Sequence, residues 1–237
     1  MKRRYPMYLI RSEKIPERIR LAVAADLHAG PYQEEMEVFL SCDALLLPGD
    51  LLDRHRRNNR RAEAFLKEVP ERLPVFYAMG NHEVKYPRAE EFAAFLAESC
   101  VHVLDNNSSY FGGIRIGGLS SPPKDEKPDT AFLDRFEAEK EFKILMCHHP
   151  ELYTPYVQGR NIDLTLCGHA HGGQIQIGGR GLYAPGQGLF PKLTHGFHDG
   201  GKMLISRGMT NAAMPWIPRI NNPCELIILE LEPEENQ

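Results

Sequence analysis

The segment ALLLPGDLLD (residues 44–53) decides the fold class of this chain. Its first four residues are apolar, and Pro48 and Gly49 follow them directly. A short apolar run bounded by turn residues is typical of a buried strand. A strand is therefore predicted over residues 44–47, with an acidic residue, Asp50, just beyond its carboxyl end.

On both sides of this segment, strands and helices alternate through the first half of the chain, whereas strands dominate the second half. Strands are predicted over residues 19–25, 44–47, 74–79, 101–104, 110–119, 142–146, 162–166, 174–177, 203–206 and 225–231. Helices are predicted over residues 34–40, 58–69 and 87–98, with a short helix after Asp129 and a long Gly- and Pro-rich loop over 178–201. This order indicates an α/β protein with two stacked sheets and helices outside them, in a single domain over residues 1–237.

Composition and length describe an ordinary globular chain. Of its 237 residues 42% are apolar and 25% are charged, and the net charge of −4 argues against a dedicated nucleic-acid-binding surface. Its apolar stretches fall short of the roughly 20 residues that span a bilayer, and the basic N-terminus has too short an apolar run for a signal peptide. The five cysteines are scattered without a CxxC pair, which argues against a disulfide framework and a structural zinc site. We therefore expect a cytoplasmic protein.

Polar residues that can bind metals follow five of the predicted strands, at the point where each strand ends. Six of the ten histidines lie in these clusters. Because the carboxyl ends of strands in open α/β sheets converge on one crevice, we expect the clusters to meet there. The clusters are Asp26-Leu27-His28, Gly49-Asp50, Gly80-Asn81-His82-Glu83, His148-His149-Pro150 and Gly168-His169-Ala170-His171.

The side chains in these clusters predict a centre with two metal ions. Asp and neutral His are good ligands for Zn, Mn or Fe, and Asn adds a neutral oxygen. The set exceeds what one tetrahedral zinc takes, and it fits two divalent ions roughly 3.5–4 Å apart that share a carboxylate. After Asp26 and Asp50 neutralise part of their charge, two such ions would still attract an anionic ester and lower the pKa of a bridging water toward hydroxide. The seven candidate ligands are Asp26, His28, Asp50, Asn81, His148, His169 and His171.

These blocks resemble the motifs of the calcineurin-like metallophosphoesterase superfamily, which are D-x-H, G-D-x-x-D, G-N-H-E/D, a later H, and G-H-x-H. The chain carries all of them in the family's order between Asp26 and His171. The resemblance implies the metallo-dependent phosphatase fold, a four-layer α-β-β-α sandwich of two mixed sheets. The extension Gly172-Gly173-Gln174 and the later blocks Ser206-Arg207-Gly208 and Pro223-Cys224-Glu225 are similar to the bacterial YkuE/YaeI-like phosphodiesterase branch.

The resemblance also implies a role for each candidate. His82 would be the general acid that protonates the leaving oxygen. Asp53 could orient His82 through a hydrogen bond, or could form a surface ion pair with Arg54. The first metal would be bound by Asp26, His28, Asp50 and His171, and Asp50 would bridge to a second metal held by Asn81, His148 and His169.

A basic run, RHRRNNRR (residues 54–61), adjoins the Asp50 block. Such a run is most often a solvated face, but its position leaves a phosphate-binding role open. Arg54 and Asn81 are therefore the candidates for holding the substrate phosphate. His195 and His198, in the predicted loop, are weaker candidates for substrate contact.

The predicted activity is hydrolysis of a phosphate ester by a hydroxide that bridges two metals, without a covalent enzyme intermediate. The branch resemblance suggests a phosphodiester or a lipid-linked pyrophosphate as the substrate. Because Gly-Asp-Leu-Leu-Asp-Arg is also similar to a phosphoprotein phosphatase block, with His55 in place of its Gly, a phosphomonoesterase or protein phosphatase is the alternative. A catalytically silent binding scaffold is a further alternative, which the complete ligand set disfavours.

Two apolar segments bear on a lipid substrate. Leu189-Phe190-Pro191 and Met214-Pro215-Trp216-Ile217-Pro218 stand in irregular regions, where exposed aromatics could touch a membrane surface. The arginine run could meet anionic headgroups there. Ordinary core packing explains the same apolar residues equally well, so any contact is expected to be peripheral, at the inner membrane face. The sequence gives no indication of the oligomeric state.

Overall fold

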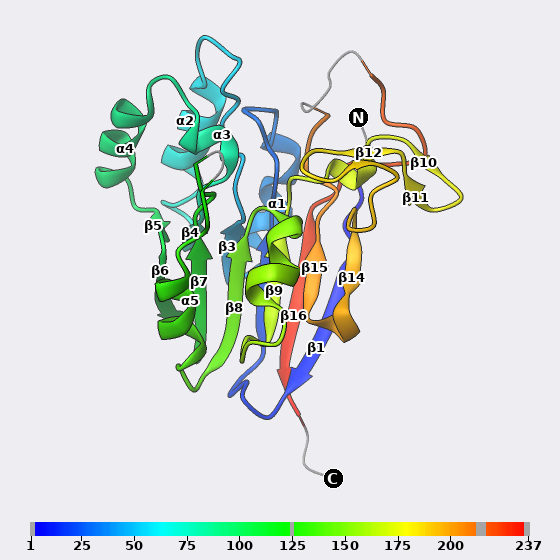
Figure 1. The fold of residues 1–237 in the computed structure, drawn as a ribbon. Coiled ribbons are helices and arrows are strands. Elements are labelled where there is room, and N and C mark those ends of the chain that lie inside the picture. Colours follow the sequence, from blue (N-terminus) through cyan, green and yellow to red (C-terminus); the bar gives the residue numbers. More distant parts are fainter. Residues whose placement is uncertain (1–2, 124–125, 212–216, 235–237) are drawn as a thin grey trace.

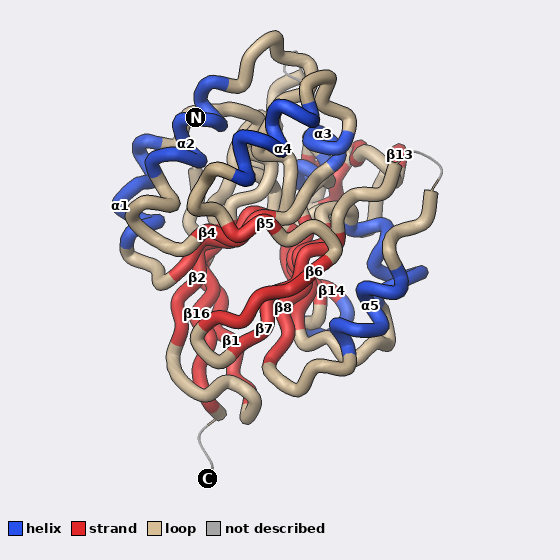
Figure 2. Tube along the Cα trace, turned by 90° about the vertical axis from the view of Figure 1, so that its left-hand side faces the viewer, coloured by secondary structure: helices blue, strands red, loops and turns tan. Residues whose placement is uncertain are grey.

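Two six-stranded β-sheets lie face to face at the centre of the computed structural model, which describes residues 3–123, 126–211 and 217–234 (Figure 2). The first sheet is built from β1 (Met7–Ser12), β2 (Ile19–Val23), β3 (Ala44–Leu47), β4 (Val75–Tyr77), β5 (His102–Val103) and β16 (Ile227–Pro233), in the order β1-β16-β2-β3-β4-β5. The second is built from β6 (Asn107–Phe111), β7 (Ile114–Leu119), β8 (Phe142–Cys147), β9 (Leu164–Cys167), β14 (Gly196–His198) and β15 (Met203–Ile205), in the order β14-β15-β9-β8-β7-β6.

Both sheets are mixed. In the first, β2, β3, β4 and β5 run parallel, and β16 is antiparallel to β2. In the second, β7, β8, β9 and β15 run parallel, and the edge strands β6 and β14 are antiparallel to their neighbours. The carboxyl ends of the parallel strands therefore lie at one end of the molecule, the upper end in Figure 1.

Helices cover the outer face of each sheet. Apolar side chains of α1 (Met36–Leu40), α2 (Arg60–Glu68) and α4 (Ala89–Ala97) form a core with one face of the first sheet, and α5 (Thr130–Glu137) does so with the second. A third core, which includes Leu46 and Ile144, fills the space between the sheets. The predicted four-layer α-β-β-α sandwich of two mixed sheets is confirmed.

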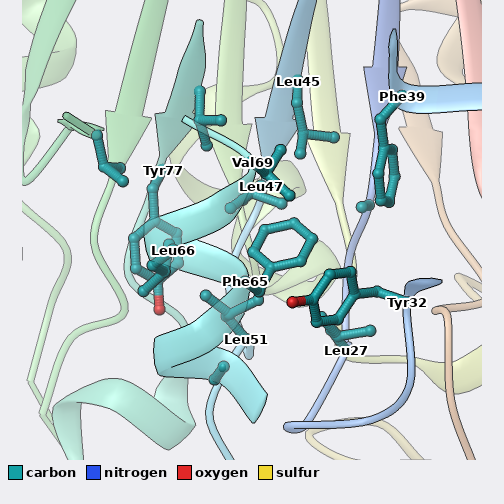
Figure 3. Packing of buried hydrophobic residues seen from close by; sticks show 14 of the residues in the cluster. Leu27, Tyr32, Phe39, Leu45, Leu47, Leu51, Phe65, Leu66, Val69 and Tyr77 are labelled. Carbon is teal, nitrogen blue, oxygen red and sulfur yellow. The ribbon is translucent and has the colours of Figure 1, made fainter. Parts of the chain in front are cut away.

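The helix α2 shows why the sequence builds these layers. Ala62, Phe65, Leu66 and Val69 recur at helical spacing, and all four are buried. Figure 3 shows Phe65 between the sheet residues Leu45 and Leu47 and the ring of Tyr32. Burial of a Phe side chain of this kind contributes about 1.5–3 kcal/mol, which holds the helix on the sheet.

One strand was missed, and the predictions for residues 110–119 and 178–201 were wrong. The strand β1 was not predicted, because only one side of it is half-buried and its first four residues are all apolar, so its sequence lacks the alternation of polar and apolar residues that is typical of an edge strand. The strand predicted over residues 110–119 is two strands, β6 and β7, joined by a turn at Gly112 and Gly113, whose positive φ angles reverse the chain.

The loop predicted over residues 178–201 contains short strands. They are β11 (Arg180–Gly181), which pairs with β10 (Gln176–Ile177), then β12 (Tyr183–Ala184), β13 (Gly188–Leu189) and the sheet strand β14. Strands of only two residues are too short to show a recognisable alternation of apolar and polar residues in the sequence. In the described part of the chain, no helix is long and apolar enough to cross a membrane.

Candidate metal centre

The seven predicted metal ligands come together at the carboxyl ends of the strands, and all seven are buried. They come from the loops after β2, β3, β4, β8 and β9, the third of which opens α3 (Asn81–Val84). Their side chains, with relative exposure, are Asp26 (0%), His28 (1%), Asp50 (1%), Asn81 (7%), His148 (1%), His169 (8%) and His171 (3%).

Three of these residues form one cluster. The Nε2 atoms of His28 and His171 lie 3.3 Å apart. Oδ1 of Asp26 lies 3.5 Å from Nε2 of His171 and 3.8 Å from Nε2 of His28. Ligand atoms that each lie about 2.0–2.2 Å from the same ion are separated from one another by distances similar to these three. The cluster therefore fits one divalent ion.

A second cluster contains Asp50, His148 and His169, whose candidate ligand atoms all lie within 4.8 Å of one another. Nε2 of His148 is 3.1 Å from Oδ2 of Asp50 without the geometry of a hydrogen bond. Oδ1 of Asn81 is also buried and has no hydrogen-bond partner among the described residues. Unpartnered buried polar atoms are costly, and a second ion would satisfy both of these.

The carboxylate of Asp50 lies between the two clusters. Its Oδ2 is 3.1 Å from Nε2 of His148 in the second cluster and 3.9 Å from Nε2 of His28 in the first. Its Oδ1 accepts a hydrogen bond from the backbone N–H of His82 at 2.8 Å, which fixes the plane of the group. The carboxylate of Asp50 is therefore within reach of both clusters.

Backbone carbonyls determine which ring nitrogen of His28 and of His148 faces the centre. Nδ1 of His28 lies 3.2 Å from the carbonyl of Leu52, and Nδ1 of His148 lies 2.8 Å from that of Pro48. Since a carbonyl only accepts, each Nδ1 carries a hydrogen, and Nε2 is the nitrogen that faces the centre.

Burial keeps two of the candidate histidine ligands in the neutral form that binds metals. Loss of solvation lowers the pKa of His169 and of His171 well below the usual value. In His148 burial acts in the same direction, but the charges of Asp50 and Asp26 outweigh it and raise the pKa to about 10. An ion at the second cluster would therefore displace a proton from His148.

The backbone around the centre is strained. Asp26, His28, Asp50, His169 and His171 all have positive φ angles, between 46° and 64°. Each such residue costs roughly 1–3 kcal/mol, and clusters of them are a feature of functional sites.

Glu83, which was not predicted to have a role of its own, holds the loop that carries Asp50. Its buried carboxylate accepts hydrogen bonds from the backbone N–H groups of Asp50 (2.9 Å), Leu52 (2.8 Å) and Gly80 (2.8 Å). The same side chain thus ties the loop after β3 to the loop after β4. The position of Glu83 in the Gly-Asn-His-Glu block was the only sequence signal for it.

Replacing Glu83 with Gln is expected to destabilise the metal-free protein by about 1–3 kcal/mol, the cost of leaving buried hydrogen-bonding groups unpaired. Both carboxylate oxygens of Glu83 accept hydrogen bonds, whereas Gln has only one acceptor oxygen. The NH₂ group of Gln would face a backbone N–H, and two donors cannot pair. Urea unfolding of the metal-free protein measures the loss. The control is Glu90→Gln on the exposed side of α4, and equal stability of the two variants would show that Glu83 does not hold the loop.

Residues late in the chain complete the support of the centre. The amide of Asn222 donates to the backbone carbonyls of His171 (2.7 Å) and Gln174 (3.1 Å). Nη2 of Arg219 lies 3.1 Å from Nδ1 of His171 and donates to the backbone carbonyl of Thr210 at 2.6 Å. At Gly208 (φ +79°) a Cβ would lie 2.8 Å from Cβ of Asp26, so this position requires glycine. Gly208, from the block Ser206-Arg207-Gly208, thus supports Asp26, and Asn222, just before the block Pro223-Cys224-Glu225, supports His171.

His82 is held by a different partner from the one suggested by resemblance. The backbone N–H of Arg54 donates to its Nδ1 at 3.2 Å, so the hydrogen of the neutral ring is on Nε2, which lies 3.9 Å from Oδ2 of Asp50. Asp53 is 3.7 Å from Nδ1 and instead accepts from His55 and Arg56. The suggested Asp53–His82 hydrogen bond is therefore wrong. Burial lowers the pKa of His82 to about 3.

A cavity of about 370 Å³ opens over the centre. Arg54, a predicted phosphate contact, lines it together with the candidate ligands Asp50, Asn81, His169 and His171. His195 and His198 do not line it among the described residues: Nδ1 of His195 contacts Thr194 and Gln176, and Nε2 of His198 contacts the carbonyl of His195. The remaining lining residues are His55, His82, Lys85, His149, Glu151, Pro185 and Gly186.

Comparison with known proteins agrees with this geometry. The family model of calcineurin-like phosphoesterases matches residues 19–173, which include all seven candidate ligands. The chain belongs to this family. An uncharacterized metallophosphoesterase of Helicobacter pylori strain J99 is 26% identical, over 72% of this chain and 48% of that protein. Another uncharacterized metallophosphoesterase, from Aquifex aeolicus, is 25% identical over 98% of this chain and 93% of its own length.

The chain thus spans about half the length of the Helicobacter relative, at 48%. Among solved structures, the protein TT1561 of Thermus thermophilus matches 63% of this chain and 81% of its own, with 17% identity and a TM-score of 0.43.

Proposed function

We propose that this chain hydrolyses phosphate esters at a centre of two divalent metal ions. The observation that carries the proposal is the position of Asp50, whose carboxylate lies between two clusters of neutral or metal-competent ligands. Two divalent ions held there, as Mn, Fe or Zn, would activate a water for attack on phosphorus and neutralise charge on the phosphate. Family membership supports the same reaction.

Each side chain around the centre has a proposed role. Asp26, His28, Asp50 and His171 would hold one ion, and Asp50 with Asn81, His148 and His169 the other. His82 lines the cavity, and its Nε2 lies 3.9 Å from Oδ2 of Asp50. There it would donate a hydrogen bond to the leaving oxygen and stabilise the negative charge that develops on it.

The substrate is proposed to be a phosphodiester or a lipid-linked pyrophosphate. Arg54 and Lys85 line the cavity, and their positive charges suit a substrate with anionic groups beyond the bond that breaks. The turn between β12 and β13 includes the lining residues Pro185 and Gly186. Leu189 at the end of β13 is 70% exposed, and Phe190 directly after it is 63% exposed. Such side chains suit contact with a lipid at the inner membrane face. Of the other apolar segment, residues 214–216 lie outside the described residues.

Hydrolysis of bis(p-nitrophenyl) phosphate and of p-nitrophenyl phosphate, each with Mn²⁺ added, tests the substrate class. We expect the diester to be cleaved with the higher kcat/KM. Preference for the monoester would contradict the diesterase proposal and favour a phosphomonoesterase or protein phosphatase. Inactivity on both, in protein that binds two ions, would contradict the proposed activity on these esters and favour a binding scaffold.

A further inference from the structure

A carboxylate that is not among the predicted ligands lies beside His169. Oε1 of Glu151 is 3.7 Å from Nε2 of His169 and 3.0 Å from Nδ1 of His149. Glu151 belongs to η2 (Pro150–Leu152), the short helical turn that begins two residues after the ligand His148. The rings of His149 and His169 lie 4.2 Å apart, so one oxygen faces both.

The surrounding chain covers part of this carboxylate, whose side chain is 26% exposed. At Gly186, whose φ is +73°, a Cβ would clash with Oε1, so the β12–β13 turn packs directly on Glu151 and requires glycine there. The second oxygen, Oε2, is buried and has no hydrogen-bond partner in the described ranges. An exposed ion pair with His149 would need neither this cover nor the unpaired oxygen, and it would contribute little.

We propose that Glu151 is a positioning residue for His169 at the second ion, an inference that rests on the proposed two-metal centre. Because Nε2 of His169 faces Glu151, Nδ1 is the nitrogen left for the ion. Metal-binding histidines commonly donate their other N–H to a carboxylate, which fixes the ring and makes the ligand nitrogen more basic. The 3.7 Å separation would shorten to a hydrogen bond once the ring carries its hydrogen on Nε2.

The competing interpretation is a third cation site. His149, Glu151 and His169 offer ligand atoms within 4.8 Å of one another. That site would require Nε2 of His169 to bind an ion, whereas the positioning role requires it to carry a hydrogen. The number of ions bound therefore separates the two interpretations.

The test is calorimetric titration of Mn²⁺ into metal-free protein, comparing wild type, Glu151→Gln and the exposed control Glu90→Gln. We expect two ions in the wild type and the control, and about 10–100-fold weaker binding of one ion in Glu151→Gln, the usual effect of removing such a partner. Glu151→Asp, which keeps the charge on a shorter side chain, should recover part of the loss. Thermal unfolding of the metal-free variants shows that each is folded.

Two ions bound with wild-type affinity in Glu151→Gln would overturn the inference and leave the proposed function intact. Three ions in the wild type, with one lost in Glu151→Gln, would overturn it in favour of the third site. Fewer than two ions in the wild type would contradict the two-metal proposal itself.

Discussion

Replacing Asp50 with Asn is expected to lower kcat/KM for bis(p-nitrophenyl) phosphate by about 10³-fold or more, which corresponds to ~4 kcal/mol at 1.36 kcal/mol per tenfold. Asn keeps the size of the side chain, and its oxygen can still accept from the backbone N–H of His82. It loses the negative charge that lies 3.1 Å from His148 and 3.9 Å from His28. Both ions would lose a shared ligand, so calorimetry should show weaker binding of each.

The matched control is Asp105→Asn, because Asp105 is exposed, accepts a hydrogen bond from the hydroxyl of Ser120 and is not among the residues that line the cavity. We expect its activity to stay within twofold of wild type. An Asp50→Asn protein that binds two ions normally and hydrolyses the diester at the wild-type rate would contradict the bridging role.

Replacing His82 with Ala is expected to lower kcat by about 10²–10³-fold, the usual effect of removing one donor that stabilises developing charge. The ring would not be a ligand in the proposed centre, so the binding of both ions should change little. The loss should be greater with diphenyl phosphate than with bis(p-nitrophenyl) phosphate, because phenolate is the more basic leaving group and depends more on a donor. Steady-state kinetics with the two diesters measures the difference.

His102→Gln is the control for this variant, since His102 is an exposed residue of β5 that stacks on Phe76. Equal losses with both diesters would contradict a role for His82 at the leaving oxygen. Loss of one ion in His82→Ala would indicate that His82 is instead a ligand, beside Asp50 and His28.

The layers of the fold could be predicted because apolar periodicity reports burial directly. The strand over residues 44–47 is apolar throughout and is β3, buried on both faces. The helix predicted over residues 58–69 is α2, with the buried side that its spacing indicated. The edge strand β1 and the two-residue strands of the loop carry no such signal, since they bury one side or almost nothing.

The grouping of the candidate ligands could also be predicted, because residues at the carboxyl ends of parallel strands must meet. The residues that hold these candidate ligands in place could not be predicted. Glu83 and Asn222 act by hydrogen bonds to backbone groups far away in sequence, and such partners are fixed only when the loops have folded. Arg219 reaches His171 from 48 residues away, and nothing in the local sequence predicts that contact.

Titration of Mn²⁺ into metal-free protein while hydrolysis of bis(p-nitrophenyl) phosphate is followed tests the central claim most directly. If two ions share Asp50 and act together, activity should appear as the second equivalent of Mn²⁺ is added and should reach its maximum at two ions per chain. Full activity at one equivalent, with no further rise, would contradict the two-metal centre.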